Sequence, residues 1–223
     1  MAKYDFRDRI YFDIIHTSIP MIHKYRYLAA LNNPPICRPP VCLRYAMWTL
    51  VASIDTEYSD YTNIFYRRAR KYIELDEMKG HGESFVTVGH AQCWALIASY
   101  EFRTMCFPRA WMSVGRTSRL VQMLGLQRVD HEGLEVKRTL APAKDWVDKE
   151  ERRRTFWIAY CNDRYASIGT GWPMTIDEKD VSNTADIGDN QFNPANRYSH
   201  TFHQAWKHSR RGSTKPPYRS QTL

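Results

Sequence analysis

The stretch at residues 145–168, DWVDKEERRRTFWIAYCNDRYASI, predicts a long helix near the end of the chain. Glu150 and Arg154 are four residues apart, which puts them on one face of that helix. Such a pair usually lies on a solvated face, and this is the interpretation we favour for it. Asp163 and Arg164 interrupt the aromatic residues that follow, which indicates partly buried ion pairs that fix helix packing and not catalysis. Gly169 stands where a left-handed cap would end the helix.

Proline and glycine divide the sequence before this stretch into further helices. Pro20 ends the first helix and stands in the first turn of the second, and Gly125 is a plausible end for the helix that Pro108 opens. No sustained alternation of apolar and polar residues occurs, so strands should be scarce. We therefore predict an all-α fold, an irregular array of six or seven helices. The predicted helices before residue 145 cover residues 6–18, 20–31, 41–53, 58–75, 84–102 and 108–124.

The composition describes one globular domain that does not span a membrane. Of the 223 residues, 43% are hydrophobic and 25% charged, and a chain of this size buries about 70% of its unfolded surface. Its apolar runs are far shorter than the ~20 residues that a membrane helix needs. The first residues, MAKYDFRDRIYF, are too polar for a secretory signal peptide. We therefore expect neither secretion nor contact with a membrane.

The net charge of +8 is concentrated near the C-terminus. Six of the 32 basic residues follow Asp189, where no acidic residue occurs, so residues 1–189 hold 26 basic and 24 acidic residues. A compact nucleic-acid-binding domain would carry its positive charge on the folded part. Residues 182–223 are polar, basic and rich in turn-forming residues, which predicts a disordered basic tail.

Cysteine and glycine form no recognisable metal-binding or catalytic motif. The five cysteines include no CxxC pair, which is typical of reduced thiols in an intracellular protein. Cys37 and Cys42 are not followed by a second pair that would complete a tetrahedral zinc site. Gly169-Thr170-Gly171 follows a helix and lacks the ending of a phosphate-binding loop. We therefore predict no catalytic residue, no metal ligand and no DNA-binding residue.

The long helix and the turn after it carry a specific motif. It consists of Glu150-Glu151-Arg152-Arg153-Arg154-Thr155-Phe156-Trp157, then Tyr160, then Asp163-Arg164-Tyr165, and finally Gly169-Thr170-Gly171-Trp172-Pro173-Met174-Thr175-Ile176. This motif resembles the signature of the fungal-specific transcription factor domain, the middle homology region of zinc-cluster regulators.

Five earlier blocks resemble the same family in the same order. The resemblance covers residues 11–181 and is closest to the subgroup that includes activators of xylan-degrading genes. The blocks lie at residues 11–23, 43–48, 66–70, 92–101 and 110–130.

The resemblance implies the regulatory domain of a nuclear transcription regulator. It also implies DNA binding and zinc binding for full-length relatives, which carry a cluster of six cysteines with two CxxC pairs. This chain has five cysteines and no such pair, so we expect no zinc in it and only indirect contact with DNA. The family signature, which we expect to be structural, comprises Arg116, Arg119, Glu150, Glu151, Arg152, Arg153, Arg154, Phe156, Trp157, Asp163, Arg164, Gly169, Gly171 and Pro173.

We predict three parts in the chain: an N-terminal extension (1–10), the regulatory domain (11–181) and the basic tail (182–223). After Val181 the family typically continues with a leucine-proline segment and further helices, and Ser182 onward shows neither. We therefore expect a domain truncated at its C-terminus, with a tail that is disordered or foreign to it, as read-through of an unspliced intron would produce.

The sequence leaves three functions open. The leading hypothesis is a regulatory domain whose helix packing is biased by a small metabolite or by a protein partner, such as the full-length regulator or a co-regulator. The second is a stand-alone interaction module that pairs with full-length regulators and titrates them. An all-α enzyme is a remote third, because nucleophile, base and cofactor motifs are absent, and we expect no enzymatic activity. Five aromatic residues could line an effector pocket, although a role in the core is favoured: Trp94, Tyr100, Trp111, Trp157 and Tyr160.

Overall fold

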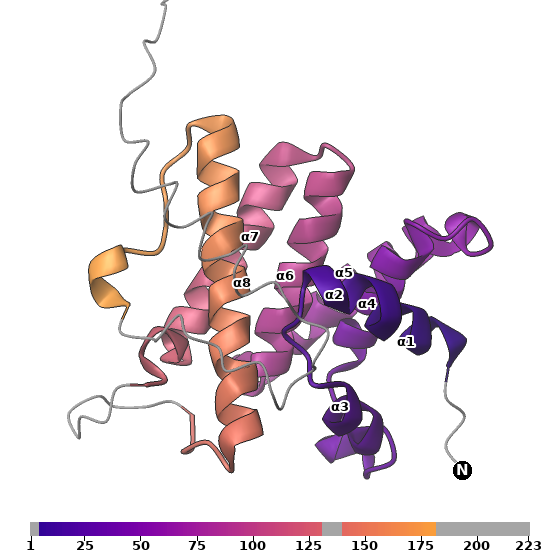
Figure 1. Ribbon diagram of the computed structural model, residues 1–223, viewed down its shortest axis with the longest axis horizontal. Helices are drawn as coiled ribbons and strands as arrows, with labels where there is room; N and C mark the ends of the chain where they lie inside the picture. The colour runs from indigo at the N-terminus through magenta and orange to yellow at the C-terminus, as the bar shows by residue number, and fades with distance from the viewer. Residues whose placement is uncertain (1–4, 131–139, 182–223) are drawn as a thin grey trace, which may run out of the picture. The chain divides into compact units, whose positions relative to one another are not determined.

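The computed structural model describes residues 5–130 and 140–181, and within these ranges it contains helices and no strand (Figure 1). The prediction of an all-α fold with six or seven helices is confirmed for this part of the chain, and the predicted tail lies outside it. The first of the seven helices is one continuous run of three pieces: α1 (Phe6–Ile10), a π-helical turn η1 (Tyr11–Ile15) and α2 (His16–Ser18). The others are α3 (Lys24–Ala30), α4 (Val41–Ala52), α5 (Thr62–Glu77), α6 (Val88–Arg103), α7 (Phe107–Met123) and α8 (Trp146–Thr170).

Short 3₁₀ turns lie in four of the connections between these helices, and one more follows α8. They begin close to proline or glycine at three places, which agrees with the divisions that the sequence predicts. The turns are η2 (Pro35–Cys37), η3 (Ser59–Tyr61), η4 (Glu83–Phe85), η5 (Leu126–Arg128) and η6 (Glu178–Asp180).

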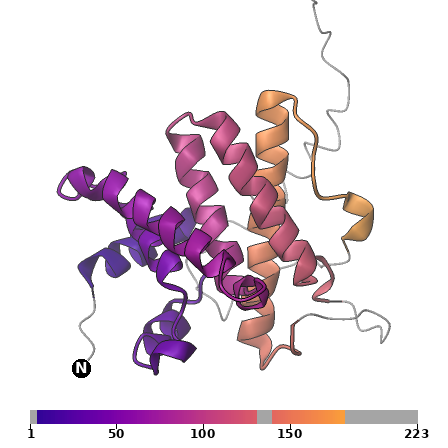
Figure 2. The same ribbon diagram turned by 180° about the vertical axis from the view of Figure 1, so that it is seen from behind.

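Helix α6 is the central element of the described fold. It packs against α4, α5, α7 and α8. Figures 1 and 2 show α7 and α8 on one side of α6 and α4 and α5 on the other. Every residue from 90 to 98 is buried. A helix that other helices enclose on all sides has no face for solvent, which agrees with the apolar run from Cys93 to Ala98.

A buried carboxylate attaches the N-terminal helix to α4. Asp8 is inaccessible to solvent and accepts hydrogen bonds from Trp48 Nε1 (2.8 Å) and from the Arg44 guanidinium (3.3 Å). Burial raises the pKa of Asp8, against the effect of these two donors. The Arg7 guanidinium lies over the Trp48 ring, 3.8 Å from its centroid. Residues 6–10 of the predicted extension are therefore helical and packed on the rest of the described fold.

The start of α3 differs from the sequence-based prediction. Pro20 is not in the first turn of this helix, which begins at Lys24. The physical reason is the cap: His23 has an extended backbone, and its Nδ1 accepts a hydrogen bond from the Arg26 N–H at 3.2 Å. Pro20 lies in the connection between α2 and α3.

The end of α8 also differs from the prediction. Gly169 does not cap this helix, which continues to Thr170, and Gly171 takes the left-handed conformation with φ of +75°. The Gly171 N–H donates to the Ser167 carbonyl at 2.8 Å and closes the last turn two residues later than predicted. The corresponding prediction for α7 is confirmed, because Gly125 follows that helix with φ of +69°.

The two glycines at the end of α8 should respond to alanine in opposite directions. Gly171→Ala is expected to lower the free energy of unfolding by about 1 kcal/mol, because a left-handed backbone is unfavourable for a residue with a Cβ. Gly169→Ala is the matched control. Its added Cβ meets no heavy atom within 4 Å, so alanine there should raise stability by about 0.5–1 kcal/mol. Urea unfolding measures both changes, and equal losses would contradict the cap at Gly171.

Candidate functional site

A buried network around Glu150 holds the long helix α8 in place. The Glu150 carboxylate is inaccessible and accepts hydrogen bonds from Arg153 and from Arg154 Nε, the latter at 2.7 Å. Arg153 also donates from Nε to Asp130 Oδ2 at 2.9 Å. The prediction that Glu150 and Arg154 lie on a solvated face is wrong, because Arg154 is only 4% exposed. Asp130 and the turn η5 lie against this part of α8.

Glu151, the next residue, connects α8 to α6 and to the N-terminal segment. Its Oε1 accepts hydrogen bonds from Gln92 Nε2 (3.2 Å) and from the His23 backbone N–H (3.4 Å). The same Gln92 amide donates to the Met21 carbonyl at 2.9 Å and to Thr155 Oγ1 at 3.2 Å. Burial raises the pKa of Glu151. One amide thus joins three segments that are far apart in the sequence.

Asp163 organises the turn that follows α8. Its carboxylate is 1% exposed and accepts hydrogen bonds from the backbone N–H groups of Thr175 (3.0 Å) and Ile176 (3.1 Å). Arg164 pairs with Asp163 at 3.0 Å and donates to the Ile176 carbonyl at 2.7 Å. The guanidinium also lies over the Tyr160 ring, 4.3 Å from its centroid. The segment after the Gly171 cap is therefore held against α8 by the hydrogen bonds that its backbone makes with Asp163 and Arg164.

Glu101 of α6 is a functional candidate that is absent from the predicted site residues. It is 1% exposed and accepts hydrogen bonds from Tyr66 OH (2.5 Å), Arg70 (2.8 Å) and Ser113 Oγ (2.6 Å). These donors come from α5 and α7, so one carboxylate joins three helices. The sequence signal for it is a single acidic residue inside an otherwise apolar helix.

The remaining charged residues of the predicted signature lie nearer the surface. Arg152 makes a two-pronged pair with Asp148, at 3.1 and 3.0 Å, and also donates to the Ala141 carbonyl. Arg116 pairs with Glu77 at 3.2 Å. Arg119 is exposed.

The aromatic residues of the signature are buried or half-buried, whereas its turn residues are exposed. Phe156 is fully buried, and half-buried Trp157 packs against it with ring centroids 5.3 Å apart. Gly169, Gly171 and Pro173 are exposed at the end of α8 and in the turn after it. The structure thus gathers the signature along α8 and its turn, apart from Arg116 and Arg119 on α7.

The five aromatic residues predicted as pocket-lining make the contacts of core packing. Trp94 is fully buried, with the Arg116 guanidinium 4.6 Å from its ring centroid. Tyr100 packs on Tyr66 (5.0 Å), Trp111 on Trp172 (5.2 Å) and Trp157 on Tyr160 (5.5 Å). Their role in a pocket stays a prediction.

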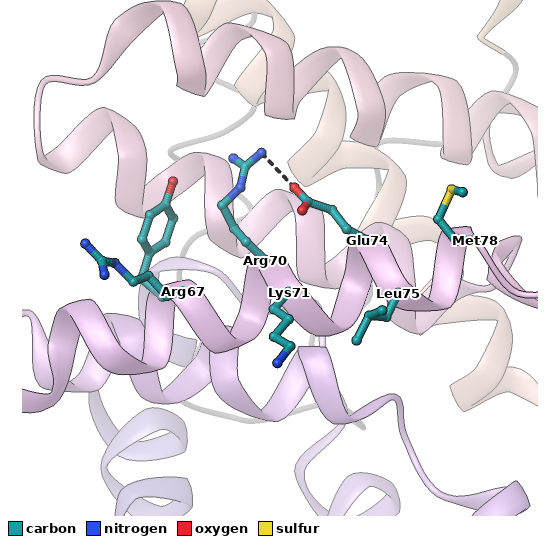
Figure 3. A pocket seen from close by; sticks show the side chains of 7 residues that line it. Arg67, Arg70, Lys71, Glu74, Leu75 and Met78 are labelled. Carbon is teal, nitrogen blue, oxygen red and sulfur yellow. Dashed lines mark hydrogen bonds and ion pairs between the residues drawn. The ribbon is translucent and has the colours of Figure 1, made fainter.

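An open pocket of about 390 Å³ lies along α5 and is lined by other residues (Figure 3). Three of its seven lining residues are cationic and one is acidic. Glu74 pairs with Arg70 at 3.2 Å, which Figure 3 marks with a dashed line. Arg70 is also paired with Glu101, so the unpaired positive charge of the lining comes from Arg67 and Lys71. The lining residues are Tyr66, Arg67, Arg70, Lys71, Glu74, Leu75 and Met78.

The cysteines of the chain do not fit the six-cysteine zinc cluster that the resemblance implies for full-length relatives. Such a cluster needs six thiolates, and the chain has five cysteines. Two of them are buried and lie on different helices, Cys42 on α4 and Cys93 on α6. Among the described helices, none is long and apolar enough to cross a membrane.

Comparison with known proteins identifies the same family over most of the chain. The family model described as the fungal specific transcription factor domain matches residues 9–218. The match passes the predicted domain end at residue 181 and enters residues that the structure does not describe. The division into residues 1–10, 11–181 and 182–223 stays a prediction. No solved structure is detectably similar.

Several curated fungal proteins are similar to the chain. The pigment biosynthesis transcriptional activator pigB of Monascus ruber is 38% identical over 177 residues, which cover 79% of this chain and 32% of that protein. The citrinin biosynthesis transcriptional activators mrl3 of Monascus ruber and ctnR of Monascus purpureus are each 33% identical over 185 residues. Those alignments cover 83% of this chain and 36% and 31% of the two relatives. The chain therefore spans about a third of the length of these relatives.

Removing the charge of Glu150 should destabilise the fold strongly. Glu150→Gln is expected to lower the free energy of unfolding by about 3 kcal/mol, because it removes the carboxylate that compensates a buried guanidinium. The matched control is Asp180→Asn, which removes an exposed pair with Arg128 and should cost less than about 1 kcal/mol. Urea unfolding of the two variants measures the difference, and a similar small loss in both would show that the Glu150 network contributes little.

The fold-back of the turn after α8 should depend on Asp163. In Asp163→Asn we expect the Thr175 and Ile176 amides to exchange hydrogen at least about tenfold faster, because each loses a charged acceptor. Hydrogen exchange followed by NMR measures these rates. Asp177→Asn is the control: it should affect the Lys179 amide, which donates to Asp177, and leave Thr175 unchanged. Unaltered exchange at Thr175 in Asp163→Asn would contradict the anchoring role.

Proposed function

Because this chain belongs to the family of the fungal specific transcription factor domain, we propose that it is the regulatory part of a nuclear activator of small-molecule biosynthesis genes. The observation that carries the family is the match over residues 9–218. The biosynthetic target is supported by the names of the relatives, which are activators of pigment and citrinin biosynthesis. The xylan-related subgroup favoured by the sequence stays a prediction. The family is one of transcription factors and not of enzymes.

Regulation by such a domain needs two arrangements of its helices that a ligand or a partner can distinguish. The pocket along α5 offers a physical link between ligand and packing. Arg70 and Tyr66 line this pocket, and both also donate to the buried carboxylate of Glu101. An anion in the pocket would therefore compete with Glu101 for the same donors.

This competition would act on the centre of the fold. Glu101 is 1% exposed, and a carboxylate at such a position is strongly destabilised when it loses a charged partner. Weakening its bond to Arg70 would loosen α5 from α6, while Ser113 on α7 would still hold the carboxylate. We therefore propose an anionic metabolite, or an acidic segment of a partner protein, as the effector. The full-length regulator and co-regulators are the partners that the family suggests.

The proposal predicts that pocket residues tune transcription. The chain is placed between a heterologous DNA-binding domain and an activation domain, and reporter expression is measured at equal protein level. We expect insertion of the chain to alter expression and Arg70→Ala to change it again by about fivefold or more, the lower end of a typical regulatory coupling. Arg67 lines the pocket but makes no contact with Glu101. Arg67→Ala should therefore alter reporter expression only in medium that supplies the anionic effector.

The matched control is Arg68→Ala. Arg68 is an exposed neighbour on α5 that lies over the Tyr45 ring and does not line the pocket, so its removal should leave expression unchanged. Expression that is indifferent to insertion of the chain would overturn the regulatory function. Equal effects of Arg68→Ala and Arg70→Ala would retain that function and overturn the role of the pocket.

A further inference from the structure

Three side chains with metal-binding atoms meet where α4, α5 and α6 come together. Cys42 lies in the first turn of α4, Asp76 in the last turn of α5 and His90 in the first turn of α6. The Cys42 sulfur, a carboxylate oxygen of Asp76 and a ring nitrogen of His90 all lie within 4.8 Å of one another. The sequence predicts no metal ligand, because these residues are far apart along the chain.

The environment of this cluster is that of an enclosed site with an edge near solvent. Cys42 is fully buried, His90 is 5% exposed, and the Asp76 side chain is 20% exposed. A second fully buried thiol, Cys93, is a neighbour of Cys42, but its sulfur does not belong to the group of atoms that lie within 4.8 Å of one another. Thiolate, imidazole and carboxylate are the ligands that Zn²⁺ prefers in proteins, and a site with three of them binds water in the fourth position.

The distances are close to those that a tetrahedral ion requires. His90 Nε2 and Asp76 Oδ2 are 3.2 Å apart. Two ligand atoms at about 2.0–2.1 Å from a tetrahedral zinc are separated by roughly 3.3 Å. An ion can therefore replace the proton that these two atoms share. The Cys42 sulfur lies within 4.8 Å of both atoms and would move toward the ion to complete the coordination.

The neighbours of the cluster already orient its ligands. Thr87 Oγ1 lies 2.8 Å from His90 Nδ1 and leaves Nε2 directed at the cluster. A metal-bound histidine typically has such a partner on its other ring nitrogen. Lys79 pairs with Oδ1 of Asp76, so that Oδ2 faces His90.

We propose that Cys42, Asp76 and His90 bind one divalent ion of the zinc type, with water as the fourth ligand at the exposed edge beside Asp76. The ion would tie the ends of three helices, all of which pack on one another at the centre of the fold. The site is separate from the six-cysteine cluster implied for full-length relatives, and the proposal does not depend on the regulatory function. Metal occupancy would instead set the stability of the α4–α5–α6 contact.

Zinc titration of the full chain tests this site. Protein stripped with a chelator is titrated with Zn²⁺ against a chromophoric competitor, and Co²⁺ is then used to detect thiolate ligation in the visible spectrum. We expect one equivalent to bind, and Cys42→Ser to weaken binding by at least the ~10- to 100-fold that loss of a residue orienting a ligand costs. Cys37→Ser, which removes an exposed thiol five residues away, is the matched control and should bind as the wild type does.

Two further variants keep the test decisive if Cys42→Ser fails to fold. Asp76→Asn alters a partly exposed side chain and should weaken binding while circular dichroism stays unchanged. Cys93→Ser leaves the three ligands in place and should keep the thiolate-to-cobalt absorption, whereas loss of that absorption in the folded variant would overturn Cys42 as the thiolate ligand. Folded wild-type protein that binds no zinc, or binding that is lost in Cys37→Ser and kept in Cys42→Ser, would overturn the site.

Discussion

Carboxylates buried between helices are the constraint on which this structure depends. Asp8, Glu101, Glu150 and Asp163 are each at most 1% exposed. A buried charge without partners costs several kcal/mol, so each one requires its donors to be in place when the chain folds. Apolar contact alone is non-directional and would tolerate several arrangements of seven helices. The four carboxylates make most of those alternative arrangements unfavourable.

Each carboxylate fixes a different part of the described fold. Asp8 attaches the first helix to α4, and Glu101 joins α6 to α5 and α7. Glu150 accepts hydrogen bonds from Arg153 and Arg154, and Arg153 in turn pairs with Asp130. Asp163 holds the segment that follows α8 against that helix. The ion pairs of Glu150 and Asp163, two residues of the family signature, therefore lie in the interior of the described fold, and a structural role for the whole signature stays a prediction.

Helix α5 is the element through which ligands could act on that packing. Its middle part lines the basic pocket and supplies Arg70 to Glu101, and its end supplies Asp76 to the cluster with Cys42 and His90. Both sites bear on the contact between α5 and α6. An anion in the pocket would compete with Glu101 of α6 for Arg70. A cation bound by Cys42, Asp76 and His90 would add a link between α5 and α6.

The sequence alone determined the helical class, most helix boundaries and the family, because these depend on local periodicity, on proline and glycine, and on an ordered motif. It placed the end of α8 at Gly169 and the start of α3 at Pro20, whereas the caps are Gly171 and His23. In both cases more than one nearby residue could serve as the cap, and backbone hydrogen bonds decide which one does. It also put Glu150 on a solvated face, because i,i+4 spacing shows which residues share a face and not what covers that face. Only the tertiary structure decided that Glu150 and Arg154 are buried, that Arg153 pairs with Asp130, that Glu101 has three donors, and that Cys42, Asp76 and His90 meet. Those contacts join residues far apart in the chain, and their formation depends on the packing of whole helices, which no local pattern contains.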